Sequence, residues 1–207
     1  MSKGRSLKPR CQKCALHQEL CICQNIPKLD FQHQYSIFQS AMEYRRPTSS
    51  GSFFYKNFKA RNYIYGRKDV EFNPNVLDSD FDSSSTYLVF PHKSSILLSD
   101  LPKNKALQFV FVDGTWSEAS RLQRRLKLAA RFQIVDLSPS FKYQIPAKLK
   151  LRNESREGGI STLEAILSVM KHCESLQNFE LLKGTYLHFL KQYQIMRGTK
   201  FKTDVQL

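Results

Sequence analysis

Four of the five cysteines in this chain of 207 residues lie within thirteen residues near the N-terminus. They are spaced C-x2-C-x6-C-x-C, and the four are Cys11, Cys14, Cys21 and Cys23. Four thiolates on short loops are typical of structural zinc sites, and a segment this small cannot bury a core without an ion. We therefore predict a basic, four-cysteine zinc-binding unit over residues 1–30. The alternatives are disulfides or a chance cluster, and His17 or His33 could replace a ligand. Cys173 falls in a helical pattern and carries no predicted chemistry.

The chain is strongly basic, with 32 Lys and Arg against 18 Asp and Glu and a formal net charge of +14. Hydrophobic residues make up 41% of it, which excludes a wholly disordered chain. No stretch approaches the about 20 apolar residues of a membrane-spanning helix. The segment Met1–Arg10 lacks the apolar region of a secretory signal. We therefore expect a cytoplasmic protein with reduced cysteines and no membrane partner.

Residues 31–207 show short β-prone runs separated by long connections, which indicates a second, larger domain. The runs are Gln34–Gln39, Arg61–Tyr65, Thr86–Pro91, Leu107–Asp113 and Arg131–Leu137. The continuous apolar run Val110–Val112 is typical of a strand covered on both faces in a parallel sheet. The segment Asp69–Ser85 is rich in Asp, Ser and Asn, so we expect a solvated loop there.

Two helices carry clear start signals. Thr115 is followed three residues later by Glu118, and Ser161 is followed in the same way by Glu164. Both are capping-box pairs, and apolar residues at helical spacing follow each of them. A third helix is expected over about Thr185–Arg197. Strands that alternate with helices predict an α/β layered domain.

The most informative junction is the one where an apolar strand ends at Asp113, turns at Gly114 and opens the helix capped by Thr115. Ligands of open α/β sheets bind at such strand ends, next to helix N-termini. Because Thr115 already fits the capping role, Asp113 either serves a ligand or caps the turn. Trp116, the only tryptophan, is either a core residue or a ligand platform. Gly158–Glu164 is a second junction, whose N–H groups could hold a carboxylate or phosphate.

Positive charge is clustered, and aromatic residues such as Phe58, Tyr63 and Tyr65 are interleaved with it. Basic patches of this kind suit a phosphate backbone with unstacked bases, as in structured RNA. A single cluster is commonly only solvated surface, but the clusters and the basic N-terminal unit together favour a polyanion partner. The residues that we predict to contact RNA are Arg45, Arg46, Lys56, Lys59, Arg61, Arg121, Arg124, Arg125 and Arg156.

The sequence Asp113-Gly114-Thr115-Trp116 matches the signature of a known family. The chain resembles the DTW-domain family, the tRNA-uridine aminocarboxypropyltransferases, which are named from Asp-x-Thr-Trp. The likeness also includes the four clustered cysteines, Glu43–Thr48 and Ser161–Ile166, in the family's order, over roughly residues 11–170. Two places depart from the pattern. Ser49-Ser50 stands where Asn-Thr is common, and Phe90–Lys93 stands where Tyr-Pro-Gly is common.

The resemblance implies transfer of the 3-amino-3-carboxypropyl group from S-adenosylmethionine to N3 of a tRNA uridine, with release of 5′-methylthioadenosine. It also implies a knotted, SPOUT-like parallel sheet flanked by helices, with the cofactor held by loops at strand ends. The cofactor contacts expected on this ground are Leu88, Phe90, Pro91, Gly114, Thr115, Trp116, Ser161, Thr162 and Glu164. Uridine N3 must lose its proton before it attacks, so a general base is needed, and Asp113 is the candidate. The zinc would be structural, because four thiolates leave no open coordination position.

Two other functions stay open at this point. A SPOUT-like RNA methyltransferase would use the same cofactor and substrate class but release S-adenosylhomocysteine. A non-enzymatic, zinc-dependent RNA-binding module would explain the charge and the cysteines but leave Asp113 without a task. A DNA partner is not expected, because the chain has no recognition-helix motif of the known types. The sequence carries no signal for the oligomeric state.

Overall fold

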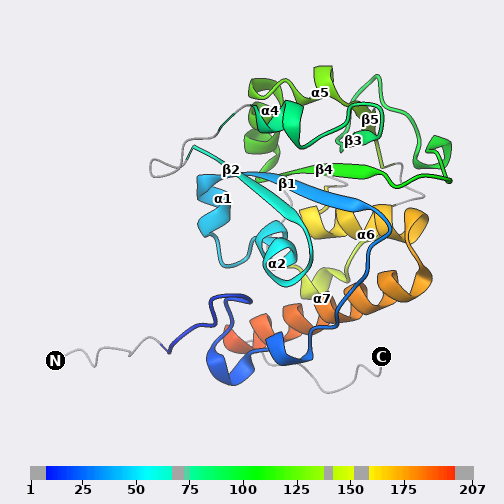
Figure 1. The fold of residues 1–207 in the computed structure, drawn as a ribbon. Coiled ribbons are helices and arrows are strands. Elements are labelled where there is room, and N and C mark those ends of the chain that lie inside the picture. The colour runs from blue at the N-terminus through cyan, green and yellow to red at the C-terminus, as the bar shows by residue number, and fades with distance from the viewer. Residues whose placement is uncertain (1–7, 67–72, 74, 138–141, 152–158, 199–207) are drawn as a thin grey trace.

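The protein is described by a computed structural model that covers residues 8–66, 73, 75–137, 142–151 and 159–198 (Figure 1). Within these ranges, one sheet of five parallel strands has the order β2-β1-β4-β3-β5. The strands are β1 (Gln34–Ser40), β2 (Arg61–Tyr65), β3 (Thr86–Val89), β4 (Gln108–Asp113) and β5 (Gln133–Val135). All five β-prone runs therefore form strands, and the predicted α/β parallel-sheet architecture is confirmed.

The register of the central strands places Gln39 of β1 opposite Asp113 of β4. On the outer side of β1, Ser40 lies opposite Tyr65 of β2. Since all strands run in one direction, their carboxyl ends meet at one edge of the sheet. That edge carries the Asp113 junction.

Helices cover both faces of the sheet (Figure 1). They are α1 (Ala41–Arg45), α2 (Ser50–Asn57), α3 (Val76–Ser79), α4 (Trp116–Arg125), α5 (Leu128–Arg131), α6 (Thr162–Cys173) and α7 (Leu176–Met196). The described part of the chain also contains four short 3-10 helices, at Gln18–Leu20, Cys23–Asn25, Leu98–Asp100 and Ala147–Leu149. None of the helices in the described ranges combines the length and the apolar character that a membrane crossing requires.

The two predicted capping boxes are confirmed. Thr115 caps α4 and Ser161 caps α6, each with its glutamate bonded back to the cap. The third helix starts earlier than expected, at Leu176, because the Ser175 side chain accepts a hydrogen bond from the Asn178 N–H and so caps a start that lacks the glutamate signal. Helix α4 ends at Arg125 because Lys127 adopts a left-handed conformation with φ of 52°.

Side chains alternate between two cores on opposite faces of the sheet, as a pleated strand requires. Tyr35 and Ile37 of β1 belong to the larger core, which includes residues of α2, α6 and α7. Phe38 and Val110 belong to the smaller core, which includes residues of α3, α4 and α5. Both faces of β4 are thus covered, which explains its continuous apolar run.

The expectation of a solvated loop over Asp69–Ser85 is wrong for part of that segment. Residues Val76–Ser79 form α3, and Leu77 and Phe81 are buried in the smaller core. These two apolar residues are isolated in a polar sequence, so periodicity did not reveal them. Residues 69–72 and 74 lie outside the described part of the chain.

The cysteine-rich N-terminal segment packs against the rest of the protein, beside the C-terminal half of α7 (Figure 1). The backbone N–H of His17 lies 3.3 Å from the Met196 sulfur. Cys14, Leu16 and Ile22 are buried in the larger core together with residues of the sheet and α7. The segment is therefore joined to the main core by apolar contacts.

Candidate functional site

Asp113, the last residue of β4, is buried, with 2% of its surface exposed. Its Oδ2 accepts hydrogen bonds from Nε2 of Gln39, at 2.9 Å, and from Oγ of Ser49, at 2.8 Å. Its Oδ1 accepts a hydrogen bond from Oγ1 of Thr162. The donors belong to the end of β1, the N-cap of α2 and the first turn of α6. The carboxylate therefore ties together three elements that are distant in the sequence.

Local structure explains how these groups reach Asp113. Gln39 lies opposite it in the strand register. Ser49 caps α2 by accepting a hydrogen bond from the Ser52 N–H at 3.0 Å, which fixes its hydroxyl. Gly51 in the first turn of α2 allows the close approach, since a Cβ built there would lie 2.6 Å from Oδ2 of Asp113.

The capped starts of α2, α4 and α6 lie at this edge, with Ser49, Thr115 and Ser161 as caps. The first turns of helices carry unpaired N–H groups and a partial positive charge. They stabilise the Asp113 carboxylate and favour an anionic ligand group nearby. The Leu163 N–H, in the first turn of α6, donates a hydrogen bond to Oγ of Ser50 at 3.3 Å, so α2 also contacts the start of α6 directly.

A second acidic group lies beside the start of α4. Glu43 is fully buried, and its Oε2 is 2.5 Å from Nη1 of Arg46. The same Arg46 nitrogen is 3.7 Å from Oε2 of Glu118, which accepts hydrogen bonds from Thr115. Arg46 therefore links the chain after β1 to the capping box that follows the Asp113 junction.

Trp116 opens α4 and is 39% exposed, so it is not a core residue. Its ring stacks on that of Phe90, just past the end of β3, with 5.3 Å between the ring centroids and 9° between the planes. A partly exposed aromatic pair at the carboxyl edge of a parallel sheet offers a flat surface for a nucleobase or another planar group.

The four clustered cysteines meet the geometric requirement for a metal site. Their Sγ atoms all lie within 4.8 Å of one another. Cys11 and Cys23 are 3.7 Å apart, and Cys14 and Cys21 are 3.8 Å apart. A tetrahedron with Zn–S distances of about 2.3 Å has S–S edges of about 3.8 Å. All five cysteines are free thiols, so the disulfide alternative does not hold in this structure.

The thiols of the cluster differ in acidity. Burial raises the pKa of Cys11, but hydrogen bonds outweigh burial and bring that pKa to about 7. They come from the backbone N–H groups of Cys14 and Lys13 and from the side chains of Cys21 and Cys23. Burial raises the pKa of Cys14 and that of Cys23 above the usual value. His33 is not part of the cluster, since its Nδ1 accepts from the Leu107 N–H and its Nε2 lies 3.0 Å from the Cys173 carbonyl oxygen.

The family profile of the DTW domain matches residues 8–194. This chain belongs to the DTW domain family. Among curated proteins, it is 24% identical over 198 residues to a Drosophila melanogaster protein named tRNA-uridine aminocarboxypropyltransferase 2. The aligned part covers 91% of this chain and 76% of that relative. No solved structure matches the chain.

The structure of this DTW domain places the sequence-predicted cofactor residues in two groups. The first group lies at strand ends or helix starts and is at least partly exposed; it consists of Phe90, Pro91, Gly114, Thr115, Trp116, Ser161 and Thr162. The side chain of Leu88 is instead buried in the smaller core, which leaves only its backbone for a ligand. Glu164 is also buried, where it accepts hydrogen bonds from the N–H groups of Ser161 and Ile145. The cofactor roles of all these residues remain predictions.

The predicted RNA-binding residues occupy the periphery of the domain. Arg45, Lys59, Arg61, Arg121, Arg124 and Arg125 are exposed, whereas Arg46 and Lys56 are half-buried. The Lys56 ammonium lies 5.4 Å from the centre of the Tyr44 ring, and the Arg125 guanidinium lies 5.1 Å from that of Tyr65. Arg156 lies outside the described residues.

Sequence reasoning missed three residues that build the Asp113 site, namely Gln39, Ser49 and Gly51. Ser49 carried only a weak signal, namely that serine is a preferred N-cap residue. Gln39 and Gly51 carried none, because their roles depend on strand register and on how α2 approaches the sheet.

Proposed function

We propose that this DTW domain is a tRNA-uridine aminocarboxypropyltransferase. It transfers the 3-amino-3-carboxypropyl group of S-adenosylmethionine to N3 of a uridine in tRNA and releases 5′-methylthioadenosine. The observation that carries the proposal is the position of Asp113, buried among three helix starts inside the family's signature. The name of the Drosophila relative and the +14 charge of the chain support tRNA as the substrate.

The carboxyl edge of the sheet offers suitable groups for S-adenosylmethionine. The partly exposed Phe90–Trp116 pair provides a planar surface for the adenine. The start of α6 at Ser161 favours the carboxylate of the methionine part. These two contacts would hold the donor at both ends. Because misplacing reacting atoms by about 1 Å can cost roughly 100-fold in rate, such orientation can select the aminocarboxypropyl carbon over the methyl group.

We propose Asp113 as the general base. The proton on N3 moves to the carboxylate, the N3 electron pair forms the new N–C bond, and the C–S bond breaks with its electrons going to sulfur. Oδ2 already accepts two hydrogen bonds, so Oδ1, which is covered by the Thr162 hydroxyl, is the oxygen better placed for this proton. The proposal therefore requires the Thr162 hydroxyl to rotate away when uridine binds.

The same contacts define a second role, in which Asp113 anchors the starts of α2 and α6 and acts on the reaction only through them. Burial and hydrogen bonds from Gln39, Ser49 and Thr162 hold the carboxylate in place between the two helix starts, which supports this positioning role. The general-base role and the positioning role predict different reaction rates when the Thr162 hydroxyl is removed.

The cysteine cluster fits a structural zinc ion held by all four thiolates. When bound, the ion would cross-link the N-terminal segment, and the four cysteines would leave it no open position for catalysis. The knotted SPOUT-like form of the sheet, the division of the chain into units 1–30 and 31–207, and a cytoplasmic location are further parts of the proposal.

The decisive experiment is analysis of tRNA nucleosides by mass spectrometry with and without the purified protein. We expect 3-(3-amino-3-carboxypropyl)uridine and an equal amount of 5′-methylthioadenosine. S-adenosylhomocysteine as the by-product would instead identify a methyltransferase. Binding of tRNA without either product would identify an RNA-binding module.

A further inference from the structure

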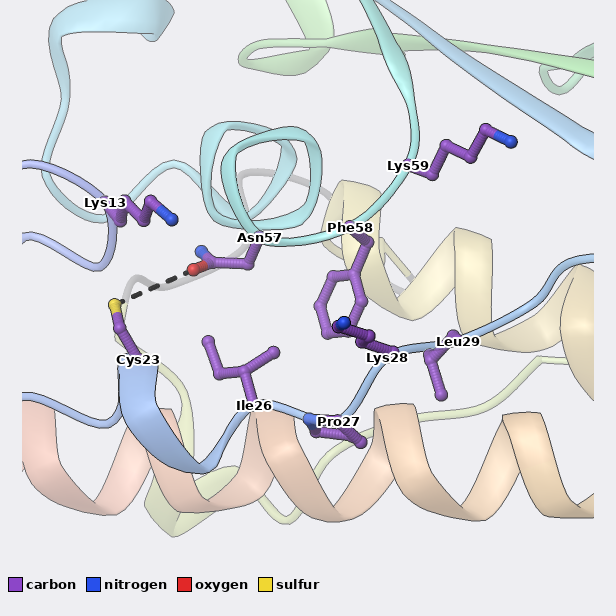
Figure 2. Close-up of a pocket in the computed structure, with 9 residues that line it drawn as sticks. All are labelled: Lys13, Cys23, Ile26, Pro27, Lys28, Leu29, Asn57, Phe58 and Lys59. Atoms are coloured by element: carbon purple, nitrogen blue, oxygen red, sulfur yellow. Dashed lines mark hydrogen bonds between the residues drawn. The ribbon is translucent and has the colours of Figure 1, made fainter.

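A cavity of about 390 Å³ lies between the cysteine-rich segment and the connection from α2 to β2 (Figure 2). It is separate from the Asp113 site, whose residues do not line it. Its lining comes from the N-terminal segment and from residues 57–59. The lining residues are Lys13, Cys23, Ile26, Pro27, Lys28, Leu29, Asn57, Phe58 and Lys59.

One wall of the cavity is apolar. It is made by Ile26, Pro27, Leu29 and Phe58, whose side chains are grouped in Figure 2. Phe58 as a residue is 8% exposed, and its ring packs against that of Phe54, with 5.5 Å between the ring centroids. The packing against Phe54 fixes the position of the Phe58 ring, so this part of the wall is formed before a ligand binds.

The polar part of the cavity is positive. Lys13, Lys28 and Lys59 line it and are exposed, and no acidic residue is among the lining residues. Lys13 and Lys59 come from opposite sides of the cavity in Figure 2. An apolar wall within reach of several cations suits a nucleobase whose flanking phosphates lie at the lysines. The volume is at the small end of ligand pockets, which run from about 300 to 1,000 Å³, and so suits a single nucleotide.

The cavity is linked through its lining residues to the cysteine cluster and to the Asp113 site. Cys23 belongs to the cysteine cluster and also lines the cavity, where its sulfur is 3.8 Å from Oδ1 of Asn57. Asn57 ends α2, whose cap Ser49 holds the Asp113 carboxylate. At 1.5 Å per residue, the eight residues of α2 place the cavity about 12 Å from the Asp113 site. A few nucleotides of single-stranded RNA can span that distance.

We propose that this cavity binds one unpaired nucleotide of the RNA substrate while the target uridine occupies the Asp113 site. The inference rests on the proposed function for the identity of the RNA. It also gives the cysteine cluster a specific task, because Cys23 and the segment that follows it form one wall. Metal binding at the cluster and nucleotide binding at the cavity are then coupled.

A matched pair of charge reversals tests the cavity. Lys28→Glu reverses a charge that lines it, whereas Lys103→Glu makes the same change in net charge at an exposed lysine that does not. We expect Lys28→Glu to weaken tRNA binding about tenfold more than Lys103→Glu and to lower the slope of log K against log salt by about one. Equal losses in both variants would overturn the inference. Both substitutions are at the surface, and unchanged melting temperatures will show that both variants fold.

Photo-crosslinking locates the contact directly. An oligouridylate containing 4-thiouridine is irradiated with the full-length protein, and the modified peptides are sequenced. We expect cross-links to residues 26–29 or 57–59, and their loss in Lys28→Glu but not in Lys103→Glu. Cross-links that avoid both segments would overturn the inference.

The failure of this inference is distinguishable from failure of the proposed function. If the wild-type protein modifies tRNA and Lys28→Glu leaves its KM for tRNA unchanged, the function stands and the cavity inference fails. If the wild-type protein releases no 5′-methylthioadenosine but the cross-links still map to the cavity, the cavity inference stands and the function fails.

Discussion

Thr162 donates a hydrogen bond to Asp113, and this contact joins the first residue of α6 to the last residue of β4 across 49 positions of the sequence. The pair lies at the carboxyl edge of the sheet, beside the start of α2. Any role of Asp113 in the reaction must account for this hydroxyl, because it donates to Oδ1 of a carboxylate that is already buried.

Asp113→Asn tests whether the reaction depends on the carboxylate. An amide has the same shape but does not accept the N3 proton, so we expect product formation to fall by about 100-fold or more. The amide also has one acceptor oxygen in place of two, so at least one of the donors from Gln39, Ser49 and Thr162 loses its acceptor, which should lower the free energy of unfolding by about 1–3 kcal/mol. Single-turnover formation of 5′-methylthioadenosine and urea denaturation measure the two effects separately.

Thr162→Ala separates the two proposed roles of Asp113. If the carboxylate is the base, Thr162→Ala removes one hydrogen bond to it and leaves the base in place, so turnover should stay within about tenfold of the wild-type rate, because one hydrogen bond contributes only about 1 kcal/mol. Thr162→Ser keeps the hydroxyl and serves as the control. A loss in Thr162→Ala as large as that in Asp113→Asn, with rescue in Thr162→Ser, would show that Asp113 acts by positioning α6.

Gly51→Ala is expected to disrupt the site from the side of α2. The added Cβ would lie 2.6 Å from Oδ2 of Asp113, so the helix or the carboxylate must shift, at a cost of about 1–3 kcal/mol. Gly184→Ala in α7 is the matched control, because a Cβ there meets no atom within 4 Å. It should stabilise the protein by about 0.5–1 kcal/mol through the helix propensity of alanine. Thermal unfolding with product formation checks both, and equal behaviour of the two variants would contradict the packing at Asp113.

Much of this fold was predictable because its signals are local. The strands follow from short apolar runs, and α4 and α6 follow from capping boxes at Thr115 and Ser161. The site was only partly predictable. Asp113 is marked by its junction, but its contact with Gln39 depends on the register between strands 74 residues apart. The close approach of Gly51 depends on the placement of a whole helix, which no local pattern encodes.

The exposure of Trp116 is another property that local sequence patterns do not predict. Its position at the start of α4 followed from the capping box, but a lone tryptophan suits a core and a surface equally well. The stack with Phe90 and the 39% exposure are set by where β3 ends relative to β4. A sequence pattern can predict which residue begins a helix, but it does not predict whether that residue is buried or exposed in the folded protein.

The pKa values of the cysteines predict an order of chemical reactivity once the metal is removed. The thiolate is the reactive form, and the pKa of Cys11 is brought to about 7, whereas burial raises the pKa of Cys14. Burial and the neighbouring Glu174 raise the pKa of Cys173 to about 12. After chelation, Cys11 should therefore be alkylated by iodoacetamide first, and Cys173 should stay a slow, protonated thiol at neutral pH.

The pH dependence of this alkylation has a definite sign. Because Cys11 loses its proton near pH 7, its rate should rise about tenfold from pH 6 to pH 8 and then level off. Zinc added before the reagent should protect all four clustered cysteines, since each sulfur would be a ligand. Peptide mass spectrometry at timed intervals gives the order. Faster alkylation of Cys173 than of Cys11, or no protection by zinc, would contradict the arrangement of the cluster.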